Sequence, residues 1–264
     1  MLGLPDRVTA CLFDMDGVVT RTATVHDAAW KEMFDEFLRA RAADTGGQFT
    51  PFDPVKDYDD YVDGKPRLEG TRAFLASRGI ELPPGSPDDP PGKPTLAGLG
   101  NRKNELFLHV LQRDGVDVYD GSRRYLAAVR AAGLRTALVS SSANTAQVLA
   151  RGLVADQFDV TVDGHVTEAK GLHGKPAPDT YLAAASMLGV EPGSAAVFED
   201  ALAGVEAGHA GKFGIVVGVD RVGQAAQLRE HGADIVVKDL ADLLPGAGPS
   251  TRPAAGPGEG GQHQ

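Results

Sequence analysis

The sequence is poor in cysteine, and it has no long apolar run. Its single cysteine, Cys11, cannot form an intramolecular disulfide, so a disulfide scaffold is excluded and a reducing compartment fits. No apolar run approaches the roughly 20 residues that a membrane-spanning helix needs. The N-terminus, MLGLPDRVTACLF, lacks a basic start followed by a long apolar stretch, so we expect no signal peptide. We therefore expect a cytoplasmic protein that does not bind membranes.

Positive charge is also scarce. The chain has 26 Lys and Arg against 36 Asp and Glu, a formal net charge of −10. An acidic chain without a basic block is a poor candidate for binding nucleic acid or an anionic membrane. Its field would also repel a phosphorylated ligand. Any anion site must therefore be local, built from a few placed cations, backbone amides or a metal.

What the sequence does contain is a regular alternation of strands and helices. The 264 residues are 42% hydrophobic and 23% charged, as in a folded globular protein of one large or two modest domains. A short buried strand is expected at 8–13. Further strands are expected at 134–140, 158–162, 195–198, 213–217 and 235–237, and helices at 123–132, 144–152, 179–188, 201–210 and 222–231. This alternation predicts an α/β fold, a Rossmann-like doubly wound parallel sheet.

A mostly helical insert separates the first strand from the others. Apolar spacing predicts helices at 23–43, 69–77 and 102–112, and a loop at 82–94, which holds six of the 17 prolines. The expected domains are a discontinuous α/β core at 1–20 and 115–245 and a cap at 21–114. Residues 246–264 hold six glycines, three prolines and no large apolar side chain, so we expect a disordered tail.

The first expected strand ends in the acidic segment Asp14-Met15-Asp16-Gly17. Side chains at positions i and i+2 of an extended chain point the same way, so both aspartates would face one site while Met15 packs into the core. Gly17 lets the backbone turn and approach a ligand closely. Ligands of open parallel sheets lie beyond the carboxyl ends of the strands. A polar turn that simply ends the strand explains the same residues.

A serine-rich segment, Ser140-Ser141-Ser142, follows the second expected strand and leads to Asn144. A hydroxyl at a strand end, beside the amides that start the next helix, is suited to holding a phosphate. Ordinary N-capping of that helix by serine or Asn144 explains the segment without a ligand, and taken alone it is the simpler interpretation.

Lys175 lies in the segment GKPAPD. Two prolines stiffen the loop that presents it, and Pro178 followed by Asp179 suits a helix start. A fixed ammonium can bind a phosphate and offset the charge of neighbouring carboxylates. A solvated lysine is the alternative, since most single lysines are of that kind.

Glu199 and Asp200 follow the apolar segment AAVF. Two acids at the end of a buried strand would be costly if they were unpaired. A hard cation such as Mg²⁺ removes that cost, because it prefers carboxylate and water oxygens. N-capping of the next helix by Asp200 is the alternative.

Together the four signals are more specific than each is alone. Asp14, Ser140 and the acidic pair fall at the ends of three expected strands, and Lys175 opens a helix in the loops of the same face. In a parallel sheet these strand ends lie along one edge. The pattern therefore predicts one shared site.

These motifs identify a family resemblance. Over about residues 8–240 the chain resembles the haloacid dehalogenase-like superfamily, through the segments FDMDGVVT, LVSSSAN, GKPAPD and FEDALAG. Within it the chain is most similar to the β-phosphoglucomutase-type branch. The additional matches lie in the insert: His26 and Trp30 in HDAAWK, Arg67 in YVDGKPR, and Lys103 and Asn104 in GNRKNELF.

The resemblance implies roles for the core residues. Asp14 would be the nucleophile that forms an aspartyl-phosphate. Asp16 would be the general acid and base, and its backbone carbonyl a metal ligand. Asp200 would bind Mg²⁺ with the support of Glu199.

The resemblance also implies a phosphate site and a cap site. Ser140 and Lys175, with Asn144 nearby, would hold the transferring phosphoryl group. Arg67 would bind the distal phosphate of the substrate. The other residues implied to act from the cap, in its closure or in sugar binding, are His26, Trp30, Lys103 and Asn104.

Two residues depart from the family pattern. Arg21 stands where many relatives carry an acid, and we interpret it as a surface charge rather than a cation at the hinge of the cap. Ala201 replaces a small hydroxyl residue that often follows the acidic pair. Segments 39–60 and 82–94 are longer than expected.

The favoured hypothesis is an Mg²⁺-dependent phosphomutase, an isomerase, that interconverts β-glucose 1-phosphate and glucose 6-phosphate. A sugar-phosphate phosphatase would use the same core with water as acceptor. A non-enzymatic phospho-acceptor module is a more distant alternative, and a dehalogenase is weaker still because it needs neither Asp16 nor the metal. The expected partner is a phosphorylated sugar, and we expect a monomer.

Overall fold

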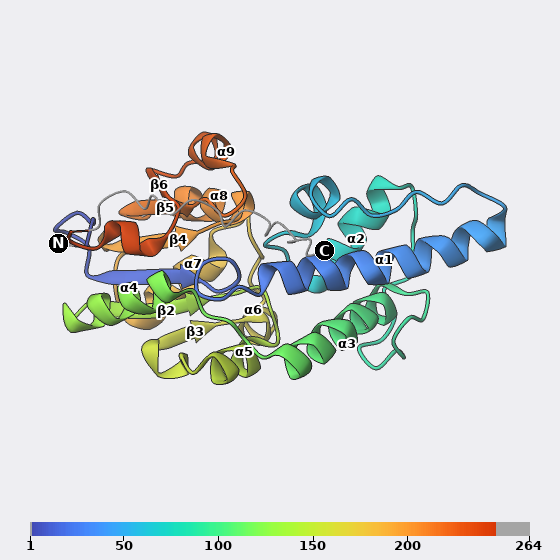
Figure 1. The fold of residues 1–264 in the computed structure, drawn as a ribbon, viewed down its shortest axis with the longest axis horizontal. Helices are drawn as coiled ribbons and strands as arrows, with labels where there is room; N and C mark the ends of the chain where they lie inside the picture. The colour runs from blue at the N-terminus through green and yellow to red at the C-terminus, as the bar shows by residue number, and fades with distance from the viewer. Residues whose placement is uncertain (1, 247–264) are drawn as a thin grey trace, which may run out of the picture.

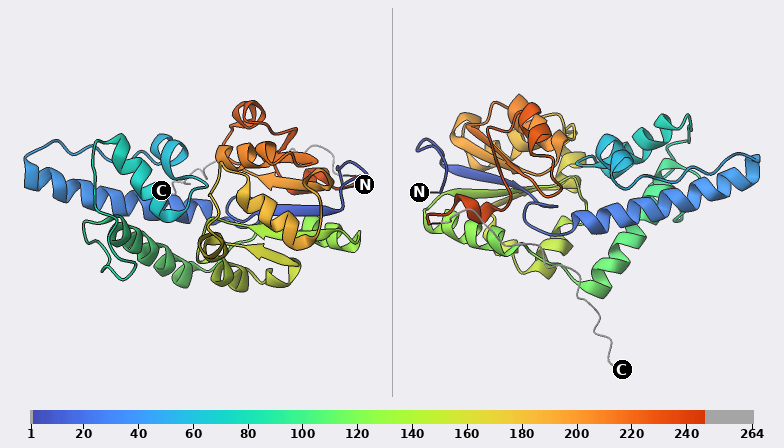
Figure 2. Two further views of the ribbon diagram at one scale, coloured as in Figure 1. Left: turned by 180° about the vertical axis from the view of Figure 1, so that it is seen from behind. Right: turned by 45° about the horizontal axis from the view of Figure 1, so that its top comes forward.

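The computed structural model describes residues 2–246 and has two parts, an α/β core and an elongated helical cap (Figure 1). The core holds both the first strand and the last elements of the described chain. The cap lies to one side of it, and α1 (Ala23–Thr45) runs along its whole length, as the two views of Figure 2 also show. Except for Gly246, the expected disordered segment 246–264 lies outside the described residues.

A single parallel sheet forms the centre of the core. Its order is β3-β2-β1-β4-β5-β6, so the chain steps outward from β1 in both directions. This confirms the doubly wound α/β fold that the alternation predicted. The strands span Ala10–Asp14 (β1), Arg135–Val139 (β2), Val160–Val162 (β3), Ala195–Glu199 (β4), Ile215–Val219 (β5) and Ile235–Val237 (β6).

Helices cover both faces of the sheet, and alternate residues of β1 therefore pack into two different apolar clusters. Cys11 and Phe13 pack with α4 and α5, whereas Ala10 and Leu12 pack with α7 and α8. A fully buried side chain as large as leucine or phenylalanine contributes about 1.5–3 kcal/mol. The helices of the core span Asp120–Ala131 (α4), Thr145–Gly152 (α5), Gly164–Lys170 (α6), Asp179–Leu188 (α7), Leu202–Ala210 (α8) and Ala225–Glu230 (α9).

The cap has an apolar core of its own. Its elements are α1, a short π-helix at Tyr58–Val62, α2 at Arg67–Ser77 and α3 at Leu96–Asp114. Stacked rings, Trp30 on Phe34 and Phe34 on Phe52, lie at its centre. Two linkers join cap and core, and they pair with each other through Thr20 and Val118.

Several elements differ from the expected ones, and three of them illustrate the causes. Helix α3 begins at Leu96 instead of 102, because the Thr95 side chain accepts a hydrogen bond from the Gly98 amide and caps the helix directly after the proline loop. Helix α6 was not predicted, although the Asp163 side chain caps it. Strand β5 is shifted to 215–219 from the expected 213–217.

The topology places several polar side chains at one edge of the sheet. Strand order reverses between β1 and β4, and ligands of such sheets bind beyond the carboxyl ends of the strands at this point. Asp14 ends β1 and Glu199 ends β4, while Ser140 follows directly after β2. Within residues 2–246, no helix is long and apolar enough to cross a membrane.

Candidate active site between core and cap

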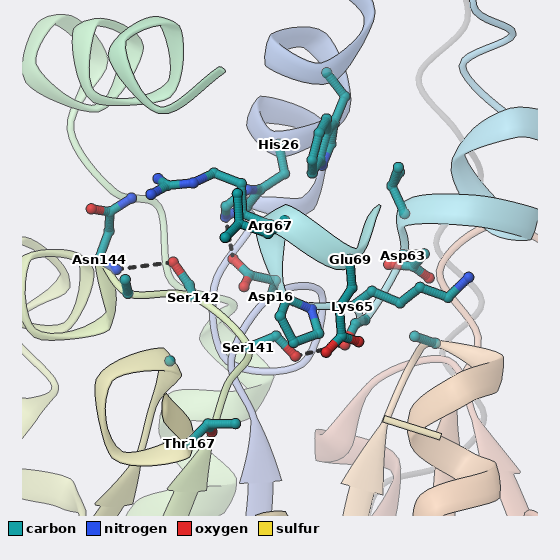
Figure 3. Close-up of a pocket in the computed structure, with 18 of the residues that line it drawn as sticks. Asp16, His26, Asp63, Lys65, Arg67, Glu69, Ser141, Ser142, Asn144 and Thr167 are labelled. Carbon is teal, nitrogen blue, oxygen red and sulfur yellow. Dashed lines mark hydrogen bonds and ion pairs between the residues drawn. The ribbon is translucent and has the colours of Figure 1, made fainter. Parts of the chain in front are cut away.

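A cavity of about 380 Å³ lies between this edge of the sheet and the cap (Figure 3). The core and the cap both contribute polar side chains to it. The expected site residues that line it are Asp14, Asp16, His26, Trp30, Arg67, Lys103, Asn104, Asn144 and Asp200. The three others, Ser140, Lys175 and Glu199, are buried below its floor.

Lys175 is buried rather than solvated, and it joins two acids. Its Nζ contacts Asp14 Oδ1 and lies 2.6 Å from Glu199 Oε1. Burial disfavours the ammonium, but these two carboxylates outweigh it and raise the pKa of Lys175 above its ordinary value. Tyr181 donates a 2.8 Å hydrogen bond to Glu199 Oε1. The lysine is therefore a fixed positive charge beside Asp14.

An acidic cluster beside this pair suits a divalent cation. One carboxylate oxygen from each of Asp14, Glu199 and Asp200 lies within 4.8 Å of the others. Burial first, and then Asp14, Asp63 and Glu199, raise the pKa of Asp200 well above its ordinary value. A Cβ on Gly17 would lie 1.6 Å from Asp200 Oδ2, so the glycine leaves room for this carboxylate.

These carboxylate oxygens therefore suit a bound divalent cation. Oxygen ligands crowded in a buried site are those of a hard divalent cation. The Asp16 carboxylate lies outside the cluster and turns toward the cap. The acids thus divide into a metal group and one separate aspartate.

Asp16 meets a row of cap residues. Thr22 donates a hydrogen bond to its Oδ1. His26 Nε2 lies 3.4 Å from the same oxygen, a contact drawn in Figure 3. Burial would raise the pKa of Asp16, but His26, Thr22 and Lys103 hold it below its ordinary value. Lys103 Nζ lies 2.5 Å from His26 Nδ1. Burial, followed by the charge of Lys103, lowers the pKa of His26.

Asn144 and Asp200 do not cap helices, so the capping alternative is wrong for both. Asn144 precedes α5, but its side chain makes no capping bond; its Nδ2 instead donates to Asn104 Oδ1 at 2.7 Å. This bond joins the core to the cap. Helix α8 has Ala201 at its N-cap position, one residue beyond Asp200. Ser140 Oγ accepts a 3.1 Å bond from the Ser142 amide at the end of β2.

Arg67 begins α2 and points into the cavity (Figure 3). Its Nε is buried and has no hydrogen-bond partner among the residues described. Burial lowers the pKa of its guanidinium. Lys103 Nζ lies 5.0 Å from the centre of the Trp30 ring. Arg67 and Lys103 therefore both present cationic groups to the cavity from the cap.

Several cavity residues were not expected from the sequence. Tyr58, Asp63, Lys65 and Glu69 also line it from the cap. Burial first, and then Glu199 and Asp59, raise the pKa of Asp63 to about 7. Asp63 and Lys65 share the segment YVDGKPR with Arg67. The Asp-Gly turn in that segment was the available signal that the whole loop faces the site.

Arg21 lies at the paired linkers. It is half exposed, its Nε lies 2.9 Å from Asp117 Oδ2, and its guanidinium lies 4.1 Å from the centre of the Tyr119 ring. The side chain therefore connects the linker that enters the cap with the one that leaves it.

Comparison with known proteins gives a consistent result. A model of the haloacid dehalogenase-like hydrolases matches residues 8–212. A β-phosphoglucomutase of Mycobacterium tuberculosis is 59% identical over 247 residues, 92% of this chain and 94% of the relative. A β-phosphoglucomutase of Bacillus subtilis is 34% identical over 89% of this chain and 91% of the relative.

Solved structures agree with the fold. A crystal structure of β-phosphoglucomutase from Clostridium difficile superimposes with a TM-score of 0.71 at 25% identity. The match covers 90% of this chain and 94% of the other. It therefore extends over the cap as well as the core.

Proposed function

The chain belongs to the haloacid dehalogenase-like hydrolase family, and on this basis we propose that it is a β-phosphoglucomutase, which converts β-glucose 1-phosphate into glucose 6-phosphate. The observation that carries the proposal is the shared cavity. Core acids line its floor with the buried Lys175 beneath them, while Arg67 and Lys103 face it from the cap. Such a cavity suits a substrate with a reacting phosphate at one end and a second phosphate at the other.

We propose Asp14 as the nucleophile. Its carboxylate would attack phosphorus to form an aspartyl-phosphate, so that the transfer is divided into two displacements. Lys175 contacts Asp14 and would offset the negative charge that two anions bring together. A bound divalent cation, which we propose is Mg²⁺ held by Asp14, Asp200 and the Asp16 carbonyl with the support of Glu199, would supply further charge neutralisation.

We propose Asp16 as the general acid and base. Its side chain faces the cavity, and Thr22 and His26 fix one of its oxygens. In a cycle that starts from phosphorylated Asp14, Asp16 would deprotonate the 6-hydroxyl of β-glucose 1-phosphate as that oxygen takes the phosphoryl group and frees the Asp14 carboxylate. Asp16 would then protonate the leaving sugar oxygen as Asp14 takes the 1-phosphate from the resulting bisphosphate. The contacts from the cap reach this aspartate only when cap and core lie together.

The cap would bind the end of the substrate that lies away from Asp14. Arg67 would hold the phosphate that does not react, and the sugar would turn between the two steps. The bond between Asn144 and Asn104 helps to close the cavity. Closure excludes water, which would otherwise hydrolyse the aspartyl-phosphate.

The test is a coupled assay with β-glucose 1-phosphate, MgCl₂ and a trace of glucose 1,6-bisphosphate. We expect glucose 6-phosphate from the wild type and none from Asp14→Asn. Arg67→Ala should lower kcat/KM about 100-fold, because a charge-assisted contact to phosphate contributes about 3 kcal/mol when buried. Arg72→Ala is the matched control, since Arg72 is exposed on the same helix and does not line the cavity.

Phosphate release without glucose 6-phosphate would contradict the proposal and identify a sugar-phosphate phosphatase on the same core. In that case Arg67→Ala should affect hydrolysis of a small monophosphate much less, because such a substrate has no second phosphate to hold.

A further inference from the structure

We propose that Ser141 is a positioning residue for this reaction: its hydroxyl holds the cap segment 63–66 on the core and thereby fixes Arg67 over the cavity. The inference rests on the proposed function and concerns a residue to which the mechanism above gives no role. Ser141 follows the buried Ser140 at the end of β2 and lines the cavity.

The contact itself is a direct bond between the two parts of the molecule. Ser141 Oγ donates to the Gly64 carbonyl at 2.6 Å (Figure 3). Gly64 lies in the turn between the π-helix and α2, with φ +69°. The serine belongs to the core and the carbonyl to the cap, so this bond forms only when the two are together.

The core surface around Ser141 is shaped to receive the segment. A Cβ on Gly64 would lie 3.6 Å from the Ala203 Cβ and 3.8 Å from the Ala201 Cβ, which is ordinary contact distance. A Cβ on Gly174 would lie only 2.6 Å from Pro66 Cδ. Small residues of the core thus let the cap backbone approach closely. This gives Ala201, which departs from the family pattern, a place in the contact.

Docking of the segment sets the position of Arg67. Pro66 occupies the N-cap position of α2, and Arg67 is the first residue of the helix. A segment held at Gly64 by hydrogen bonding and at Pro66 by packing therefore fixes where α2 begins. Without the Ser141 bond, the guanidinium would be presented from a looser loop, and the closed form would be less populated.

The test compares wild type, Ser141→Ala and Ser141→Thr in three measurements. The first is kcat/KM for β-glucose 1-phosphate. The second is the binding of glucose 6-phosphate, followed by the fluorescence of Trp30, the only tryptophan, which lines the cavity. The third is the hydrolysis of acetyl phosphate, a small donor that has no second phosphate for Arg67.

In Ser141→Ala, kcat/KM for β-glucose 1-phosphate and the affinity for glucose 6-phosphate should each fall about fivefold. This factor corresponds to one net hydrogen bond of about 1 kcal/mol. Acetyl phosphate hydrolysis should stay within about twofold of the wild type. Ser141→Thr keeps the hydroxyl and should restore sugar-phosphate binding. Ser77→Ala, which removes a 2.7 Å bond from a serine to a carbonyl inside the cap, should change none of the three.

An equal loss in all three measurements for Ser141→Ala would overturn the proposal, because it would indicate a defect in the core chemistry. Unchanged glucose 6-phosphate binding would overturn it as well. Failure of the wild type to form glucose 6-phosphate would refute the proposed function instead; Ser141 would then be judged by the binding measurement, which needs no turnover.

Discussion

At the residue scale, the surroundings of Lys103 in the cavity strongly shift its pKa. It is 5% exposed, and its Nζ lies 2.5 Å from His26 and about 5 Å from the centres of the Trp30 and Phe107 rings. Burial lowers its pKa to about 7, with Asp16 opposing that shift and Arg67 adding to it. Near neutral pH, its charge therefore depends on small changes in proton concentration.

We predict that substrate affinity falls as pH rises through this value. Below about pH 7 Lys103 is charged and attracts a phosphate; above it the amine is neutral, so KM for β-glucose 1-phosphate should rise by up to about tenfold between pH 6.5 and 8.5. Lys103→Arg keeps its charge over this range. Steady-state kinetics should therefore give a flatter KM profile for the variant, and parallel profiles would contradict the assignment.

The candidate residues at the edge of the sheet could be predicted because each ends or follows a strand. Asp14, Ser140 and Glu199 end or follow apolar runs, and parallel pairing then brings them to one edge. Asp63 and Ser141 could not be predicted in the same way. Their contacts depend on how the cap sits on the core, and a strand pattern carries no information about that.

At the scale of elements, the linkers between core and cap meet at one aromatic ring. Two guanidinium groups contact the Tyr119 ring, that of Arg221 at 3.6 Å and that of Arg21 at 4.1 Å from the ring centre. Arg221 Nε also donates to the Gly17 carbonyl at 2.7 Å, and its Nη1 to the Lys238 carbonyl at 2.9 Å. The loop after β5 thereby holds the turn that follows Asp16.

We predict unequal stability effects from the two arginines. Arg221→Met should lower the free energy of unfolding by about 2 kcal/mol, because it removes a part-buried and an exposed hydrogen bond of a charged group together with a cation–π contact. Arg21→Met should cost less than about 1 kcal/mol, since Arg21 is half exposed and its ion pair is a surface pair. Urea unfolding measures both. Equal losses would contradict this account of the linkers.

The elements that were predicted least well are those set by local caps. Periodicity found the centre of α3 but not its start, because the Thr95 cap lies directly beside a proline-rich loop. Helix α6 is too short for a periodic pattern, and Val166 is its only apolar side chain packed against the core cluster. In contrast, the strands were recognisable as short apolar runs, because both faces of the sheet are covered.

At the scale of the whole molecule, part of the net charge of −10 is concentrated at the candidate active site. Asp14, Asp63, Glu199 and Asp200 gather at the carboxyl edge of the sheet with Lys175 as the cation between them. The acidity that argues against anion binding thus includes the acids that would hold a divalent cation. Without a bound divalent cation, the burial and mutual repulsion of these carboxylates lower the stability of the folded protein.

We predict that the stability of the metal-free protein falls as the pH rises. The pKa of Asp200 is raised in the folded protein, so above its ordinary value near 4 the unfolded chain binds fewer protons than the folded one. Its contribution to the free energy of unfolding therefore falls as pH rises. In EDTA we expect a lower Tm at pH 7.5 than at pH 5.5.

A bound cation should reverse this trend. At about ten times its Kd, MgCl₂ should raise Tm by about 3 °C at pH 7.5 and by less at pH 5.5, with KCl of equal ionic strength as the salt control. Asp200→Asn should lose the Mg²⁺ shift and gain stability in EDTA, because the amide has no charge to bury. Asp44→Asn, at an exposed position of α1, should keep the shift. Equal Mg²⁺ shifts in both variants would place the cation elsewhere.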